Sequence, residues 1–432
     1  MRSASSLRFA PSCPASLSRP RTRAAFLPYG TASPPPRMKA GSLLRAGSLL
    51  MGPLSARLAL TQPRCESGSM DRTAAAAPPP LRVGLIGYGL AGSVFHAPLI
   101  ATTEGLTLDT VVTANPDRRA QVHAEHGSDM RTLATADELF ARADGLDLVV
   151  VASPNRTHVT LARRALEAGL PVVVDKPLAG TSAEAQQLAS LAAERGLLLS
   201  TFHNRRWDND FRTVRSLVAD GALGDRIHRF ESRYERWRPE LKGGWRESGD
   251  PAEVGGLLYD LGSHLVDQAL TLFGPATAVY AETDVLRPGA QADDDAFVAL
   301  THANGVRSHL WMSAVAAQLG PRLRVLGSAA AYVKDGLDPQ EAALREGARP
   351  TPGERWGVEP EIAWGTLGDL DARRPVPTLD GDYPAYYAGI VTALREGTPP
   401  PVTAHEAVAT IRVLEAARIS AAESRVVTTD LA

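Results

Sequence analysis

The sequence predicts an α/β protein with two folded domains. The first is a Rossmann domain with a doubly wound parallel sheet, and the second is an α+β domain with a large open antiparallel sheet. Between residues 81 and 203, short apolar runs alternate with helical stretches, and a glycine motif follows the first run. After residue 203, strands follow one another with few helices between them. Alternating strands and helices indicate a parallel sheet, and consecutive strands indicate an antiparallel one.

The dinucleotide-binding domain is expected over residues 80–203. Its predicted strands are residues 81–86, 106–112, 146–152, 172–174 and 197–201. Capping boxes that run from Thr135 to Glu138 and from Thr181 to Glu184 mark two helix starts between these strands.

The second domain, residues 204–432, is expected to bind substrate and to form oligomers. Its predicted strands are residues 227–236, 276–283, 296–303, 306–314 and 322–327. One helix is predicted over residues 257–273, and the chain is predicted to end in helices over residues 385–396 and 404–423.

Residues 1–79 are predicted to be a disordered leader. Residues 1–80 hold twelve of the 32 prolines and show no sustained apolar period, so they cannot bury enough surface to offset chain entropy. The chain has 42 Arg against 4 Lys, which suggests a GC-rich gene in which an upstream start is easily misassigned, with the true start near Met70. A composition rich in Arg and Ser and nearly free of acids leaves organellar import as one alternative, and a native but unstructured tail is the other.

Charge and cysteine content exclude several classes of function. The net charge of -2 combines +9 in residues 1–69 with -11 in residues 70–432. An acidic body argues against nucleic acid as a partner. Both cysteines, Cys13 and Cys65, precede Met70, so the body has no thiol nucleophile, disulfide or Cys-ligated zinc. Arg45 and Arg57 interrupt the most apolar stretch, so we expect a cytoplasmic protein with no membrane partner.

A dinucleotide motif follows the first predicted strand directly. It consists of Gly87, Tyr88, Gly89, Leu90, Ala91 and Gly92. The first glycine permits a tight turn, the second lets backbone N–H groups approach a pyrophosphate, and the third lets the helix pack on the strand. A strand before the motif and a helix after it make a Rossmann cofactor site the favoured interpretation.

The end of the second predicted strand bears on the choice of cofactor. NAD-binding domains usually place a carboxylate about twenty residues after the glycines to bind the ribose hydroxyls. Here Thr113 is followed by Ala114 and Asn115, and then by Arg118 and Arg119. The missing carboxylate and the nearby arginines favour NADP(H) over NAD(H), although the arginines also fit a solvated helix face.

Three further motifs follow later predicted elements. Ser153-Pro154-Asn155-Arg156-Thr157-His158 follows the third predicted strand, Asp175-Lys176-Pro177 follows the next one, and Asp260-Leu261-Gly262-Ser263-His264 lies in the second domain. Together with the glycine motif, they resemble the family of glucose-fructose oxidoreductase, inositol dehydrogenase and rhizopine-catabolism proteins (Gfo/Idh/MocA) over residues 81–430. Many members carry Glu where this chain has Asp175.

The resemblance implies an NAD(P)-dependent dehydrogenase that acts on the CH–OH groups of sugars, polyols or related alcohols and ketones. It implies His264 as the general acid/base, Asp260 as the partner of His264 or a ligand of the substrate, and Lys176 as hydrogen-bond donor to the reacting oxygen. It also implies a homodimer or homotetramer formed through the open sheet. Within the same family, an NAD-dependent glycosidase and a non-catalytic dinucleotide sensor remain alternatives.

The residue chemistry agrees with these roles. Lys176 follows a strand end, where open α/β sheets bind ligands, and it is a rare Lys in an Arg-rich chain. Asp260 and His264 are four residues apart on a predicted helix, so they are expected to share a face. A catalytic carboxylate and imidazole kept beside Lys176 argue against a sensor.

The remaining candidates would line the cofactor and substrate sites. Ser153, Pro154, Asn155, His158 and Asp175 are expected beside the cofactor, although His158 also fits a helix cap. Substrate contacts are expected from Lys176, Asp260 and His264 and from two clusters that place aromatic rings beside polar donors: Asn204, Arg205, Arg206 and Trp207, and Tyr234, Arg236, Trp237 and Arg238. These clusters also fit a sheet rim. No histidines show a metal-ligand spacing, so no metal is expected.

Overall fold

The computed structural model describes residues 78–430. The predicted leader, with Cys13, Cys65 and the start proposed near Met70, lies outside the described residues, so those expectations stay predictions. Among the described residues, no helix combines the length and the apolar character needed to cross a membrane.

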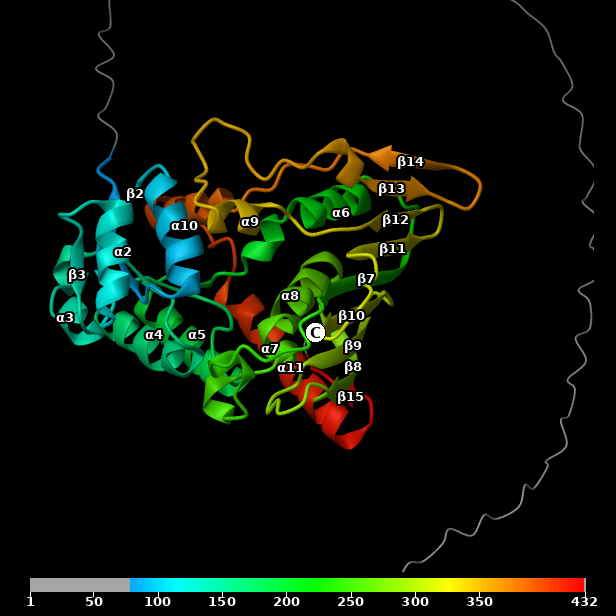
Figure 1. Cartoon of the computed structure of the whole chain (residues 1–432), viewed down its shortest axis with the longest axis horizontal. Helices are drawn as coiled ribbons and strands as arrows, with labels where there is room; N and C mark the ends of the chain where they lie inside the picture. The colour runs from blue at the N-terminus through cyan, green and yellow to red at the C-terminus, as the bar shows by residue number, and fades with distance from the viewer. Residues whose placement is uncertain (1–77, 431–432) are drawn as a thin grey trace, which may run out of the picture. The chain divides into compact units, whose positions relative to one another are not determined.

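The first domain, coloured from blue to green in Figure 1, contains the predicted parallel sheet. Its six strands lie in the order β3-β2-β1-β4-β5-β6. The strands are β1 (Leu81–Ile86), β2 (Leu106–Val112), β3 (Arg131–Leu133), β4 (Leu148–Val151), β5 (Val172–Val174) and β6 (Leu199–Thr201). This order reverses direction between β1 and β4, which is where doubly wound sheets open a crevice for a dinucleotide.

Helices cover both faces of this sheet. They are α1 (Ala97–Thr102), α2 (Pro116–His126), α3 (Ala136–Phe140), α4 (His158–Glu167) and α5 (Ser182–Arg195), and a π-helical segment, η1 (Ala91–His96), precedes α1. Both predicted capping boxes are confirmed: Thr135 caps α3 with Glu138, and Thr181 caps α5 with Glu184. β3 was not predicted, because three residues at a sheet edge give little apolar signal.

The second domain is built on a nine-stranded sheet in the order β14-β13-β12-β11-β7-β10-β9-β8-β15. The strands are β7 (Ile227–Glu235), β8 (Ala276–Asp284), β9 (Asp295–His302), β10 (Arg307–Ser313), β11 (Leu323–Gly327), β12 (Ala331–Lys334), β13 (Gly365–Gly368), β14 (Arg373–Val376) and β15 (Val427–Thr428). The sheet is mixed and not purely antiparallel as expected, because β7 and β10 pair in parallel. The chain between these two strands crosses over through a helix, which lets it return in the same direction.

Six helices complete the described fold: α6 (Asn209–Ala219), α7 (Leu257–Asp260), α8 (Gly262–Phe273), α9 (Gln340–Arg345), α10 (Pro384–Glu396) and α11 (Ala404–Glu423). The two C-terminal helices tie the domains together. Tyr386 and Tyr387 of α10 are buried in the same cluster as Val83 of β1. Ile411 of α11 packs into a cluster of the first domain, whereas Leu414 packs into the core of the second. The relative position of the two domains therefore rests on apolar burial along both C-terminal helices.

A buried ion pair connects α8 and α11 to the turn after β6. Both Asp267 carboxylate oxygens accept hydrogen bonds from Arg206, at 2.9 Å and 2.7 Å, and Glu406 accepts a third at 2.8 Å. Arg206 and Asp267 are both buried. The expectation that Arg206 belongs to a substrate-binding cluster is therefore wrong, because its guanidinium is used inside the fold.

Replacing Arg206 with Met should lower the free energy of unfolding by about 3 to 5 kcal/mol, because it leaves the carboxylate of Asp267 buried without its partner. Urea unfolding would measure this loss. The double variant Arg206→Met/Asp267→Leu removes both charges and should recover most of the loss. A single variant within about 1 kcal/mol of the parent protein would contradict this account.

Candidate active site

The glycine motif forms a tight backbone cradle at the end of β1. A Cβ on Gly87 would lie 2.6 Å from the carbonyl oxygen of Ala152, and one on Gly92 would lie 2.1 Å from the carbonyl oxygen of Gly87. Both contacts are with backbone, so no larger residue fits. At Gly89, by contrast, a Cβ would meet nothing nearer than the Arg118 side chain at 3.8 Å. The cradle is thus bounded by backbone at Gly87 and Gly92 and open to a ligand at Gly89, which fits the phosphates of a dinucleotide.

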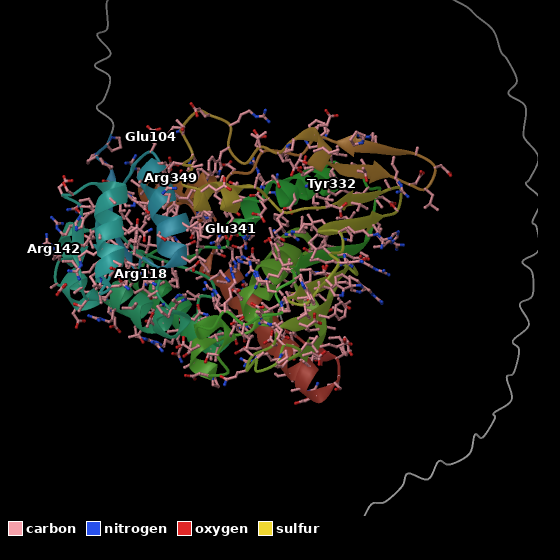
Figure 2. The ribbon with its side chains drawn as sticks, viewed as in Figure 1. Glu104, Arg118, Arg142, Tyr332, Glu341 and Arg349 are labelled. Carbon is pink, nitrogen blue, oxygen red and sulfur yellow. The ribbon has the colours of Figure 1, made fainter. Side chains whose placement is uncertain are left out.

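The end of β2 holds the residues on which the expected cofactor preference rests. Asn115 caps α2 by accepting hydrogen bonds from the backbone N–H groups of Asp117 and Arg118, at 2.9 Å and 3.1 Å. The Arg118 side chain, labelled in Figure 2, is exposed. Its guanidinium lies 3.8 Å from the place that a Cβ on Gly89 would take. Arg119 is partly buried, and its Nε has no hydrogen-bond partner among the described residues. Thr113 is buried at the strand end.

A cavity of about 910 Å³ opens between the two domains. Leu90 and Ala91 of the glycine motif line one part of it, and Lys176, Asp260 and His264 line another. The three predicted catalytic residues, which the sequence separates by up to 88 positions, therefore meet in one space with part of the predicted cofactor loop.

Lys176 and Asp260 form a close pair across the domain boundary. The Lys176 ammonium donates to the Asp260 carboxylate at 2.8 Å and to its backbone carbonyl at 2.6 Å. Burial opposes ionisation of Asp260, but Lys176 and Arg246 outweigh it and hold the pKa of this carboxyl well below its usual range. An ammonium has three donors, so one remains for a ligand in the cavity.

The geometry corrects one expectation about Asp260. The predicted helix over residues 257–273 is broken between α7 and α8, and Asp260 pairs with Lys176 and not with His264. The carbonyl of Asp260 accepts from the ammonium of Lys176, whereas the backbone N–H of His264 bonds to Leu261 at 3.2 Å. The backbone turn between Asp260 and His264 is therefore distorted, with His264 bonded three residues back to Leu261, although both residues line the cavity.

His264 is buried, and its Nδ1 has no hydrogen-bond partner among the described residues. Burial lowers the pKa of the imidazole well below 6.5, and the positive charges of Lys176 and Arg205 lower it further. The imidazole is therefore neutral at neutral pH. A neutral imidazole facing a cavity can accept a proton from a hydroxyl group.

His158 does not have a ring nitrogen left for a cofactor. Its Nδ1 lies 2.8 Å from the carbonyl oxygen of Pro177, and its Nε2 lies 2.9 Å from that of Ser153. The ring thus links the loops after β4 and β5, so the expected cofactor contact by His158 is wrong. Asn155 bonds across the domain boundary, with its amide donating to the carbonyl of Glu253 at 3.2 Å. The loop that contains Pro154 is held in place by these contacts.

Asp175 and Tyr88 have different surroundings. Asp175 lines the cavity and lies 3.7 Å from the Nε2 of His96. Burial raises the pKa of its carboxyl, but His96 and Lys176 outweigh burial and lower it.

The hydroxyl of Tyr88 donates to Glu125 at 2.8 Å and the ring is buried, so Tyr88 packs the glycine loop against α2.

The predicted substrate residues divide into two groups. Asn204, Arg205 and Arg238 line the cavity, as does Tyr234. The two tryptophans do not line the cavity. The ring centroid of Trp207 lies 5.6 Å from that of Tyr386, and the side chain of Trp237 is 57% exposed. Contact of either tryptophan with substrate therefore stays a prediction. Asn204–Trp207 forms a single helical turn, so its neighbouring side chains point in different directions.

Two segments of the cavity wall were not predicted. One is α9, which carries Glu341 (Figure 2). Glu341 pairs with Arg205. The other is the loop that contains Lys242, Arg246 and Glu247. Neither segment has a motif or a sustained apolar period; the paired glycines Gly243 and Gly244 were the one sequence signal for the loop.

Comparisons with known proteins agree with this architecture. The sequence profile described as "Oxidoreductase family, NAD-binding Rossmann fold" matches residues 81–203, and the family's "C-terminal alpha/beta domain" matches residues 215–429. The uncharacterized oxidoreductase YdgJ of Escherichia coli is 42% identical over 340 residues, covering 78% of this chain and 94% of YdgJ. The scyllo-inositol 2-dehydrogenase (NADP(+)) IolW of Bacillus subtilis is 36% identical over 351 residues, covering 80% of this chain and 95% of IolW.

Solved structures with the same fold include the oxidoreductase yvaA from Bacillus subtilis. It superposes with a TM-score of 0.76 at 34% identity, covering 82% of this chain and 99% of its own. The oxidoreductase YPO2259 from Yersinia pestis superposes with a TM-score of 0.75 at 40% identity, covering 81% of this chain and 97% of its own.

Replacing His264 with Ala should lower turnover by about 10² to 10⁴, the usual contribution of a general acid/base. Because alcohol oxidation needs the neutral imidazole and the pKa of His264 is lowered, the acid limb of kcat/KM should lie below pH 6.5. Steady-state rates from pH 5 to 9 would measure both effects, with NADPH binding as the control for folding. Turnover at the parent level would assign the proton to another group.

Proposed function

This chain belongs to the Gfo/Idh/MocA oxidoreductase family, and on that premise we propose that it transfers a hydride between NADP(H) and a CH–OH group of a sugar or polyol. One observation carries the proposal. Lys176, Asp260 and His264 line the same cavity as Leu90 and Ala91 of the glycine loop. An acid/base pair beside a dinucleotide cradle is what oxidation of a secondary alcohol requires.

The bound cofactor would supply the hydride acceptor. The chain's own residues handle the proton and the developing charge. Asp260 fixes the ammonium of Lys176 with two hydrogen bonds, and the third N–H donates to the hydroxyl oxygen of the substrate. His264, which is neutral and lines the cavity, accepts the hydroxyl proton on its imidazole.

Two observations support NADP(H) over NAD(H). The residues directly after β2, Thr113, Ala114 and Asn115, include no carboxylate, and the exposed Arg118 lies beside Gly89. The relative IolW is a scyllo-inositol 2-dehydrogenase that uses NADP(+). Arginine beside the adenosine ribose is suited to a 2′-phosphate.

A screen of inositols, aldoses and their keto forms with NADP(H) and NAD(H), followed by nicotinamide absorbance, would test the activity. Reduction of free cofactor by a polyol or sugar supports a dehydrogenase. Glycosidic cleavage without net cofactor change would indicate a glycosidase, and cofactor binding without any turnover would indicate a sensor.

Replacing both Arg118 and Arg119 with Ala should weaken NADP(H) binding by about tenfold or more, because charge-assisted contacts to phosphate contribute on the order of 1.5 to 3 kcal/mol. NAD(H) binding should stay nearly unchanged. Titrations that follow the fluorescence of NADPH and NADH would give both constants. The single variant Arg118→Ala should account for most of the loss, and equal losses for the two cofactors would contradict the assignment.

Replacing Lys176 with Arg keeps the charge but should lower turnover by about 10² or more, the scale of losing one preorganised donor. A planar guanidinium cannot bond to both the carbonyl and the carboxylate of Asp260 and also present a donor at the same point. Initial rates with the substrate from the screen would measure the change, and NADPH binding should be unaffected. Turnover within a factor of about three of the parent would remove Lys176 from the proposed chemistry.

A further inference from the structure

Most charged side chains that line the cavity are paired within the protein. Lys176 bonds to Asp260, and Glu247 accepts from Arg287 at 2.9 Å. Glu341 pairs with Arg205. The remaining acids are occupied in the same way; Glu235, for example, accepts from a backbone N–H at 2.7 Å and lies 3.8 Å from the guanidinium of Arg233.

Three cations of the same cavity differ from the rest. Arg236, Arg238 and Lys242 line it, yet the side chains of all three make neither a hydrogen bond nor an ion pair with any residue in the described range 78–430. Arg236 is the most enclosed of them, and its Nε is buried without a hydrogen-bond partner. The other two side chains are exposed.

Arg236 follows the last residue of β7, and its backbone N–H is fixed by a 2.9 Å bond to Ser313. Burial lowers the pKa of its guanidinium, as do the positive charges of Arg238 and Arg287, whereas Asp260 opposes this effect. Arg236 lines the same cavity as Lys176 and Asp260. A buried donor without a partner costs free energy, so an anion at this position would be stabilising.

We propose that the cavity recognises an anionic substrate, a sugar or polyol that carries a carboxylate or a phosphate, with Arg236 as the main partner of the anion and Arg238 and Lys242 at its edge. This inference rests on the proposed function and narrows its substrate class. Guanidinium binds carboxylate and phosphate oxygens in pairs, so one arginine can both bind and orient such a group.

A neutral polyol should bind less tightly to these three cations than an anion does. Recognition of hydroxyl groups needs acceptors as well as donors, because each hydroxyl both gives and takes a hydrogen bond. The carboxylates of Glu341 and Glu247 already accept from arginines. The groups left without partners are cations, and a neutral ligand would leave their charge uncompensated.

The test compares three probes with six-carbon chains: D-gluconate, D-glucitol 6-phosphate and neutral D-glucitol. Each is titrated calorimetrically into the full chain with NADPH bound, because the reduced cofactor cannot oxidise an alcohol. At least one anionic probe should bind about tenfold or more tightly than glucitol. Comparison of the carboxylate with the phosphate then identifies the anion.

The variant Arg236→Met should remove about tenfold or more of that affinity and leave glucitol within about threefold. Arg236→Lys should restore part of it. Arg142→Met is the matched control, because Arg142 is an exposed arginine at the outer edge of the first domain (Figure 2) and should change nothing. Melting temperature and NADPH affinity report on the fold of each variant.

The possible failures can be told apart. Equal affinity for glucitol and both anions, or equal losses for all three in Arg236→Met, would overturn the anionic substrate class while leaving dehydrogenase activity intact. Anion binding that depends on Arg236 in a protein that oxidises no alcohol would retain the anion site and reject the proposed function.

Discussion

The contact between the ammonium of Lys176 and the two acceptors of Asp260 is the interaction on which the site depends. It joins the end of β5 to the junction of α7 and α8, residues 84 positions apart in the chain. The carbonyl of Asp260 accepts from Lys176, and the backbone N–H of His264 bonds to Leu261. The contact also keeps the pKa of the Asp260 carboxyl low, because the nearby ammonium of Lys176 stabilises a carboxylate that is largely removed from water.

Apolar packing of the C-terminal helices supports that contact from outside the cavity. Because α11 contributes Ile411 to one core and Leu414 to another, movement between the domains would expose apolar surface on both sides of the helix. The buried pair of Arg206 and Asp267 adds a polar tie at the same junction. The position of Lys176 relative to Asp260 thus depends on packing across the whole interface between the two domains.

Much of the fold could be predicted because buried parallel strands read as continuous apolar runs and because the glycine motif has one structural context. Short edge elements such as β3, β13 and α9 gave too few residues for a period to be recognised. The pairing of Asp260 was not predicted for a different reason: its partner is a lysine 84 residues away in the chain. Similarly, aromatic and basic residues in neighbouring positions indicated a site, but the single helical turn of Asn204–Trp207 determines which of them face it.

Because lysine is scarce in this chain, amine-modifying reagents can be used to probe the cavity selectively. Of the four lysines in the chain, Lys176 and Lys242 line the cavity, and Lys334 is 1% exposed and bonded to Glu359 at 3.1 Å. Lys39 lies outside the described residues. In the described part of the chain, the lysine side chains accessible to a reagent selective for primary amines are therefore those in the cavity. A ligand bound in the cavity should slow modification of Lys176 and Lys242, so the modification rate reports on ligand binding.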